Sequence, residues 1–331
     1  MRIAIVKLSA LGDIIHAMVV LQFIKEFNQN ILIDWVVEEK YKELLNLNPN
    51  INNVYSVNFS KIKKKKSIFL LVKELKRFQK FSQYDLVIDL QGLIKSAIIA
   101  KLIPSKKTIG FDKFSSRERL SSFFYNKTFS YEYDKNVILR NTSLIEFSLG
   151  FKIEEKKIKN KVPFLFSTIK NLEINFDNTK KNILLIPGAS HASKRYSVTK
   201  LAEITKMLSA NFYIIWGNEE EKSLALKIKK FSPEINICKK LQLNELIYLI
   251  SKVDLVIGPD TGPSHISWAL NVPSIILFGP TPGYRNTFAT SINRVIESES
   301  VVNPYKINKD DYSINNIDSE KVIESAKNLL S

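Results

Sequence analysis

Cysteine and histidine are nearly absent from this sequence, which restricts the chemistry it can support. The chain has one cysteine, Cys238, and three histidines among its 331 residues. A single cysteine excludes a disulfide framework within the chain and fits a reducing compartment. Because Cys238 ends the strand-like run 235–238, we expect a buried thiol and not a nucleophile. The sequence has no Cys/His cluster with metal-ligand spacing and no Asp-x-Asp at a strand end, so it predicts no metal site.

Long apolar runs are missing as well. No stretch approaches about 18 uninterrupted apolar residues, so we expect no transmembrane helix and only peripheral membrane contact. The first residues look like the start of a signal peptide, but Lys7 and Asp13 interrupt the apolar run and no clear cleavage site follows. The sequence therefore predicts a cytoplasmic protein.

Negative charge is scarce relative to positive charge. Lys and Arg number 49 against 33 Asp and Glu, a formal net charge of +16. Such a surplus favours anionic partners, namely nucleic acid, phospholipid head groups or phosphorylated small molecules, although a composition rich in Lys, Asn and Ile explains it equally well. A nucleic-acid-binding protein would need a basic stripe interleaved with exposed aromatics, or a reader motif, and neither is present. No nucleic-acid partner is expected.

Strand-like and helix-like segments alternate along two stretches of the chain. Strands are predicted at residues 3–7, 31–37, 54–57, 85–90, 182–186, 212–216, 235–238, 255–258 and 274–278. Helices are predicted at residues 14–27, 41–47, 67–78, 94–102, 198–208, 219–230, 243–251, 262–270 and 319–330, with Ser319 as the expected cap of the last one. This order indicates two doubly wound α/β units with parallel sheets. The polar stretch 160–181 interrupts the rhythm, so we predict domains at 1–165 and 175–331.

The first strand-to-helix junction reads Ser9-Ala10-Leu11-Gly12-Asp13. Gly12 allows the tight turn that exposes backbone amides at a helix N-terminus. Asp13 then lies in the first helical turn, where an acid also suits ordinary capping. The residues alone favour capping, and a functional carboxylate is the alternative.

The second junction, Pro187-Gly188-Ala189-Ser190, is followed by Lys194 and Arg195. Hydroxyl donors and cations after a strand are typical of an anion-binding loop, although the GxxxxGK[ST] spacing of a P-loop is absent. A solvated basic turn fits the same residues equally well.

The third junction, residues 258–265, follows an apolar strand and opens a helix. Thr261, Gly262 and Ser264 would place donors where a diphosphate meets the positive end of the helix dipole. His265 could donate to a phosphate, and the alternative is a packed histidine on the first helical turn. This junction is the most specific of the three.

Several segments, taken in order, resemble glycosyltransferase family 9 over essentially the whole chain, and resemble its type I heptosyltransferases more than type II. The segments are Lys7-x-Ser9-Ala10-Leu11-Gly12-Asp13, residues 34–39, Asp85-x-Val87-Ile88-Asp89-x-Gln91-Gly92-Leu93-x-Lys95-Ser96, Phe124-Tyr125-Asn126, Trp216-Gly217, Asp260-Thr261-Gly262-x-Ser264-His265 and Gly279-Pro280-Thr281.

The resemblance implies a GT-B fold of two facing Rossmann-like domains. The N-terminal domain would bind the acceptor and supply the base, and the C-terminal domain would bind the nucleotide sugar. The last helix is a candidate to pack back on the N-terminal domain. The donor would be ADP-heptose and the acceptor Kdo-lipid A, with inversion, no metal cofactor, and peripheral contact with the cytoplasmic face of the inner membrane. A family 9 enzyme for another sugar or acceptor, or a GT-B sugar epimerase, is the alternative.

The resemblance also assigns roles to single residues. Asp13 would be the general base, and Lys194 would assist catalysis at the leaving diphosphate. The implied donor-binding residues are Ser9, Gly12, Ser190, Lys194, Glu219, Leu241, Asp260, Thr261, Gly262 and His265. We infer that the basic low-complexity run 61–66 before the helix at 67–78, together with Arg117, meets the acceptor's carboxylates and phosphates, with Lys61, Lys63 and Lys64 as its candidates. A solvated loop fits this run equally well.

Overall fold

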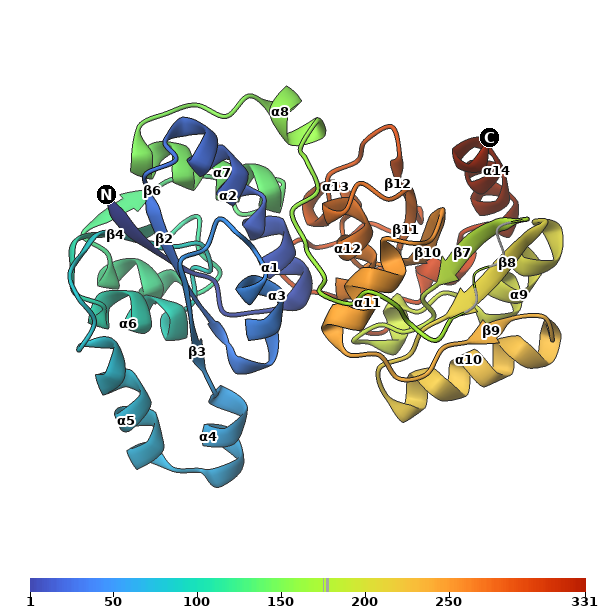
Figure 1. The fold of residues 1–331 in the computed structure, drawn as a ribbon, viewed down its shortest axis with the longest axis horizontal. Coiled ribbons are helices and arrows are strands. Elements are labelled where there is room, and N and C mark those ends of the chain that lie inside the picture. The colour runs from blue at the N-terminus through green and yellow to red at the C-terminus, as the bar shows by residue number, and fades with distance from the viewer. Residues whose placement is uncertain (175, 177–178) are drawn as a thin grey trace. The chain divides into compact units, whose positions relative to one another are not determined.

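Two six-stranded sheets organise the residues that the computed structural model describes, which are 1–174, 176 and 179–331 (Figure 1). The strand order is β3-β2-β1-β4-β5-β6 in one sheet and β12-β11-β10-β7-β8-β9 in the other, and every pairing between neighbouring strands is parallel. Counted from the first strand of each sheet, both orders are 3-2-1-4-5-6, which is the order of a dinucleotide-binding Rossmann fold. The predicted α/β class with parallel sheets is confirmed.

The chain divides into two units, Met1–Phe164 (unit 1) and Leu165–Ser331 (unit 2). The division falls between Phe164 and Leu165, whereas the start proposed for the second domain, residue 175, lies outside the described residues. Within the described ranges, no helix is long and apolar enough to cross a membrane.

Unit 1 alternates strands and helices from its first residues. Its elements are β1 (Arg2–Val6), α1 (Leu11–Met18), α2 (Val20–Phe27), β2 (Leu32–Glu38), η1 (Glu39–Tyr41), α3 (Lys42–Asn46), β3 (Asn53–Val57), α4 (Phe59–Lys65), α5 (Ile68–Phe78), β4 (Tyr84–Asp89), α6 (Ile94–Leu102), β5 (Ser105–Phe111), η2 (Arg119–Phe124), β6 (Lys127–Phe129), α7 (Val137–Leu149) and α8 (Glu155–Lys159). Helix α6 contacts β1, β4 and β5, while α7 contacts β4, β5, α1 and α2. Figure 1 shows α6 and α7 on opposite sides of the strands.

Unit 2 repeats the pattern. Its elements are β7 (Lys181–Leu185), η3 (Ala192–Lys194), α9 (Val198–Met207), β8 (Ala210–Ile214), α10 (Glu219–Phe231), β9 (Asn236–Ile237), α11 (Leu243–Ile250), β10 (Leu255–Pro259), α12 (Gly262–Ala269), β11 (Ser274–Phe278), α13 (Gly283–Asn286), β12 (Asn293–Glu297), η4 (Ser313–Asn316) and α14 (Ser319–Leu330). The last helix, α14, packs against α9, β10 and β11 of its own unit, where Val322 and Ala326 join the core.

Four differences from the sequence prediction are informative. Residues 14–27, predicted as one helix, form α1 and α2 with a break at Val19. The lysine run 61–66, taken as a low-complexity loop, mostly belongs to α4, whose N-cap Asn58 accepts the Lys61 N–H at 2.8 Å. The cap of α14 is Asp318 and not Ser319, because the Asp318 carboxylate accepts the Glu320 N–H. Strands β5, β6 and β12 and helix α7 were not predicted.

Candidate functional site

Each sheet has a switch point between its first and its fourth strand. The connections that follow these two strands cross to opposite faces of the sheet. Open α/β sheets bind ligands at this point, beyond the carboxyl ends of the strands. In unit 1 the loops after β1 and β4 meet there, and in unit 2 the loops after β7 and β10 meet there. The three junctions found in the sequence are three of these four loops.

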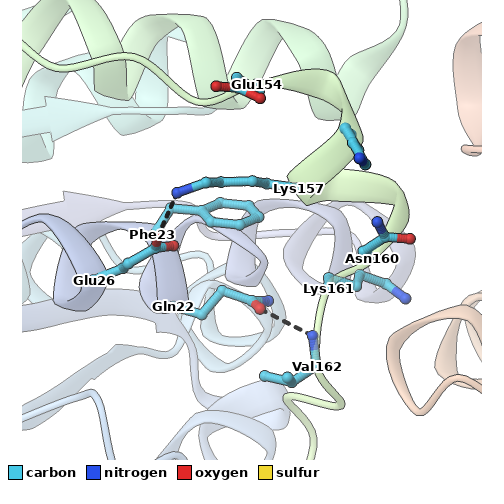
Figure 2. Close-up of a pocket in the computed structure, with 9 residues that line it drawn as sticks. Gln22, Phe23, Glu26, Glu154, Lys157, Asn160, Lys161 and Val162 are labelled. Carbon is cyan, nitrogen blue, oxygen red and sulfur yellow. Dashed lines mark hydrogen bonds and ion pairs between the residues drawn. The ribbon is translucent and has the colours of Figure 1, made fainter.

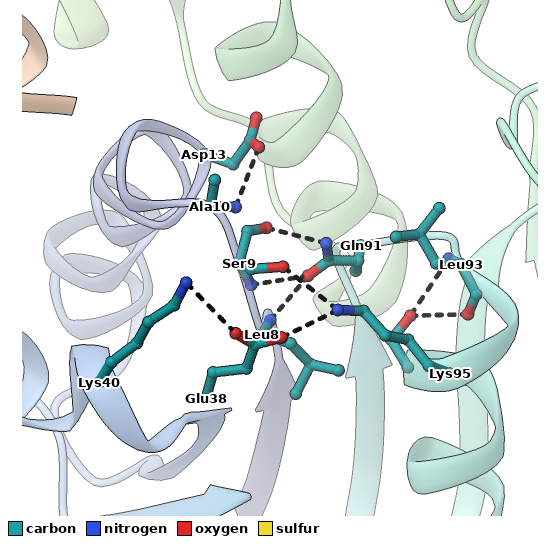
Figure 3. A network of polar contacts seen from close by, with 10 residues as sticks. Leu8, Ser9, Ala10, Asp13, Glu38, Lys40, Gln91, Leu93 and Lys95 are labelled. Carbon is teal, nitrogen blue, oxygen red and sulfur yellow. Dashed lines mark hydrogen bonds and ion pairs between the residues drawn. The ribbon is translucent and has the colours of Figure 1, made fainter. Parts of the chain in front are cut away.

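Gln91 joins the two loops of unit 1 (Figure 3). Its Oε1 accepts the backbone N–H of Leu8 at 2.7 Å and of Ser9 at 3.1 Å, and its Nε2 donates to the Ser9 carbonyl at 2.8 Å. One side chain therefore satisfies three backbone groups that no strand partner reaches. Gly92 follows with φ +68°, a conformation that favours glycine.

Asp89, the last residue of β4, supports this loop from below. Its carboxylate accepts Gln91 N–H at 2.8 Å, Ser96 Oγ–H at 2.8 Å and Tyr125 O–H at 2.8 Å. Burial raises the pKa of Asp89, although these hydrogen bonds act in the opposite direction. Asp89 therefore acts as a buried hydrogen-bond centre beneath the loop.

Asp13 lies at the N-terminus of α1 and is exposed. Its Oδ2 accepts the Ala10 N–H at 3.2 Å, so the carboxylate caps the helix and still faces solvent. Gly12, beside it, is partly exposed. The two interpretations of Asp13 from sequence, capping and function, are compatible in this geometry.

Lys95 links the Asp13 loop to two other elements (Figure 3). Its Nζ lies 3.0 Å from Glu38 Oε1 at the end of β2 and donates to Ser9 Oγ at 3.4 Å. The same Nζ lies 5.4 Å from the ring centroid of Phe59, the first residue of α4. The lysine-bearing helix α4 is thereby held close to the loop that carries Asp13.

Asp260 is the centre of the site in unit 2. Its Oδ2 lies 2.8 Å from Lys194 Nζ, and its Oδ1 lies 3.0 Å from His265 Nε2. Thr281 Oγ and Asn286 Nδ2 donate to Oδ2 at 2.9 and 3.3 Å. Burial disfavours the charge of Asp260, but Lys194 and His265 outweigh burial and hold its pKa well below the ordinary value. Asp260 is thus a buried anion that positions Lys194.

The remaining donors of unit 2 lie on the loops around this ion pair. Ser190 is exposed, and Thr261 and Gly262 are partly exposed at the N-terminus of α12. Ser264 is not available to a ligand, because its buried hydroxyl donates to the Pro259 carbonyl at 2.7 Å. His265 is 4% exposed with Nε2 directed at Asp260, which matches the packed alternative considered for it.

A carboxylate also approaches the loop after β7 from α10. Glu219 points outward, with a side chain 83% exposed and 3.8 Å from Lys222. Glu221 packs inward instead: it accepts Gly217 N–H at 2.7 Å, and a Cβ added at Gly188 would lie 2.4 Å from its Cδ. Gly188 thus lets the Glu221 side chain approach the loop closely, and a larger residue at 188 would displace that side chain.

The other residues predicted for the site are exposed or partly buried. Lys61, Lys63 and Lys64 are exposed on α4, and Arg117 is exposed before η2. Leu241 is partly buried before α11. Cys238 is buried as predicted, and burial raises its pKa to about 12.

Sequence analysis assigned no role to five residues that the structure places at these loops, which are Gln91, Lys95, Glu221, Thr281 and Asn286. Gln91, Lys95 and Thr281 stand in motifs that carried the family resemblance, so a signal existed for all three. Asn286 lies outside these motifs and reaches the site from α13, which only the folded chain reveals.

A separate pocket of about 410 Å³ lies between α2 and the α8 region of unit 1 (Figure 2). Gln22 Oε1 accepts Val162 N–H at 3.1 Å and Glu26 pairs with Lys157 at its wall. Burial lowers the pKa of Lys161, a further wall residue, to about 8. None of the predicted site residues lines this pocket.

The chain is also similar to known proteins in sequence and in fold. Residues 70–305 match the model of glycosyltransferase family 9 (heptosyltransferase). The chain is 37% identical to lipopolysaccharide heptosyltransferase 1 of Campylobacter coli, over 99% of each chain. It is 27% identical to lipopolysaccharide heptosyltransferase 1 of Escherichia coli K12, over 86% of this chain and 89% of that protein. The E. coli heptosyltransferase WaaC, solved with ADP, has the same fold, with a TM-score of 0.80 and 21% identity over 99% of this chain and 100% of that chain.

Replacing Gln91 with Leu should loosen the Ser9 loop. The Leu8 and Ser9 amides would lose their acceptor, so their hydrogen exchange should become about tenfold faster, equivalent to roughly 1.4 kcal/mol. Hydrogen-exchange mass spectrometry of peptides spanning residues 8–13 measures this change. Gln79→Leu, at the exposed end of α5, is the matched control. Unchanged exchange in Gln91→Leu would show that the loop does not depend on this side chain.

Replacing Asp260 with Asn should lower the free energy of unfolding by roughly 3 kcal/mol at neutral pH, because it leaves a buried cation without its partner. Asp260 has a depressed pKa in the folded chain, so its contribution is present above the ordinary Asp pKa of about 4 and is lost as pH falls below it. The difference between wild type and variant should therefore shrink in acid. Urea unfolding at several pH values tests this, with exposed Asp310→Asn as control; a difference independent of pH would contradict it.

Proposed function

Since the chain belongs to glycosyltransferase family 9, we propose that it is an inverting heptosyltransferase of type I, which transfers L-glycero-D-manno-heptose from ADP-heptose to a Kdo residue of Kdo-lipid A in lipopolysaccharide inner-core synthesis. One observation carries the proposal: the loops at the two switch points hold an exposed carboxylate, Asp13, in unit 1 and a positioned cation, Lys194, in unit 2. A displacement at a sugar phosphate needs these two groups.

Unit 2 would hold the ADP moiety of the donor. An ammonium group has three N–H donors, and Lys194 directs one of them to Asp260, which leaves others for phosphate oxygens. Ser190 and the amides at the start of α12 would add neutral donors at the positive end of the helix dipole. Because the departing group is ADP, stabilising the charge that develops on its phosphate is expected to be the largest catalytic contribution.

Unit 1 would activate the acceptor. Asp13 would take the proton from the acceptor hydroxyl as that oxygen attacks the anomeric carbon, while the bond from that carbon to the phosphate oxygen breaks. The attack comes from the face opposite ADP, so the configuration inverts and no covalent intermediate forms. Ser9 and Gly12 shape the same loop, which Gln91 holds in place.

The adenosine and the acceptor would be bound by groups around these loops. Glu219, exposed at the start of α10, would bind the ribose hydroxyls, while the neighbouring carboxylate of Glu221 is engaged with the Gly217 N–H. Leu241 would line the base pocket. Exposed Lys61, Lys63, Lys64 and Arg117 would meet the carboxylates and phosphates of the acceptor.

The enzyme would work without a metal ion, in the cytoplasm, in peripheral contact with the inner membrane. Phosphate charge would be met by Lys194, hydroxyls and backbone amides. Asp260 supports this arrangement, since its charge is already engaged by Lys194 and His265.

The deciding experiment incubates the chain with ADP-heptose and Kdo-lipid A and weighs the lipid product by mass spectrometry. We expect one added heptose, with the same yield in excess chelator. An acceptor that already carries one heptose should not be extended. Product only on that second acceptor would favour a type II enzyme, and a strict divalent-metal requirement would contradict the proposed charge balance.

Asp13→Asn should reduce kcat by about 10²- to 10⁴-fold, because the amide cannot accept the acceptor's proton. Binding of ADP, measured by calorimetry, should remain within a factor of a few, since the donor's phosphates are assigned to unit 2. Glu320→Gln, in the first turn of α14, is a matched control that removes an exposed carboxylate from a helix start. Turnover of Asp13→Asn equal to that of the control would discard Asp13 as the base.

A further inference from the structure

Helices α4 and α5 carry apolar side chains that no part of unit 1 covers. Ile68 is 79% exposed, Phe69 75% and Val72 41%. In Figure 1 the two helices form a hairpin that extends from one end of unit 1, away from α7 and α8 of the same unit. Contiguous exposed apolar residues of this size mark interaction surfaces.

Only part of the apolar side of α5 packs on the core of unit 1. Ile68, Val72 and Leu75 lie at positions i, i+4 and i+7, on the same side of the helix, with Phe69 beside them. Toward the C-terminal end of α5, Leu75 packs on the core cluster of unit 1 and Phe78 is fully buried. Toward its N-terminal end the same side extends beyond the core, and we call this exposed part, Ile68, Phe69 and Val72, the outer apolar side.

Positive charge surrounds the outer apolar side. Residues 59–78 contain seven lysines and one arginine but a single acid, Glu74. The five lysines at 61 and 63–66 are all exposed, directly before Ile68. Basic side chains near an anionic lipid surface strengthen binding to that surface, and long lysine side chains reach head-group phosphates while apolar neighbours insert deeper. The pattern is that of an interfacial amphipathic segment.

We propose that the α4–α5 hairpin docks on an anionic phospholipid surface, with Ile68, Phe69 and Val72 entering the boundary between head groups and acyl chains. The proposal rests on the proposed function, because the proposed acceptor is itself a lipid. Docking on phospholipid does not require that acceptor to be present. Phe59 at the start of α4 contacts Lys95, which also contacts Ser9. A docked hairpin would therefore bring a membrane-borne acceptor close to the loop that carries Asp13.

The test uses the full chain and sedimentation with vesicles that contain no acceptor. Binding should be weak to phosphatidylcholine vesicles, strong when phosphatidylglycerol is included, and reduced by salt. Ile68→Ser/Phe69→Ser should lower binding to the anionic vesicles by about tenfold or more, the loss expected when one or two apolar side chains no longer insert. Leu226→Ser/Phe231→Ser, which removes two exposed apolar residues of α10 in unit 2, should bind as wild type does.

Two further readouts separate this proposal from its alternatives. With a water-soluble, deacylated acceptor, Ile68→Ser/Phe69→Ser should turn over as wild type does, and with acceptor in vesicles it should be slower. If neither acceptor is used but anionic vesicles are bound, the proposed reaction fails and the docking surface stands. Equal vesicle binding by the variant and the α10 control overturns the docking proposal. A dimer in vesicle-free solution that Ile68→Ser/Phe69→Ser dissociates also overturns it, because a second copy would then cover this surface.

Discussion

The 3-2-1-4-5-6 strand order imposes one constraint on both units: the loops after the first and fourth strands lie next to each other at the switch point. Beyond the last strand pairings, a side chain connects the two loops in each unit. Unit 1 uses the neutral amide of Gln91, which bonds the backbone of Leu8 and Ser9. Unit 2 uses an ion pair between Asp260 and Lys194. Everything proposed for the chemistry depends on these two bridges.

A carboxylate occupies the same topological position in both units, but its surroundings shift its pKa in opposite directions. Asp89 ends β4 and Asp260 directly follows β10. Asp89 is bonded by hydroxyls and amides only, and burial raises its pKa. Asp260 faces Lys194 and His265, which lower its pKa against the effect of burial. The first carboxylate therefore shapes a loop, while the second fixes a cation, because the Asp260 carboxylate compensates the largely buried ammonium group of Lys194.

Continuous apolar runs predicted the central strands of both sheets, because β1, β4, β7 and β10 are buried on both faces. This signal is missing at the margins of the sheets. Strand β5 begins with partly exposed Ser105 and exposed Lys106 and Lys107, and β6 is short and largely exposed, so neither shows a strand pattern. The loops with Asp13, Lys194 and Asp260 were predicted because glycines, hydroxyls and charges cluster there in sequence. The link from Asp260 to Asn286, 26 residues away, depends on the folding of β11 and α13 and has no local signal.

Helix α4 has little support from its own sequence, so its formation depends on contacts with neighbouring residues. It has seven residues, none of them buried, and such a short helix is marginal in isolation. Its support comes from the Asn58 cap, from the contact between Phe59 and Lys95, and from packing against α5. An element held by so few contacts lies at the low end of local stability within a domain. A segment of this kind costs little to reorient and gains most from an external surface, which is consistent with a basic hairpin whose partner is a membrane and not the core of its own unit.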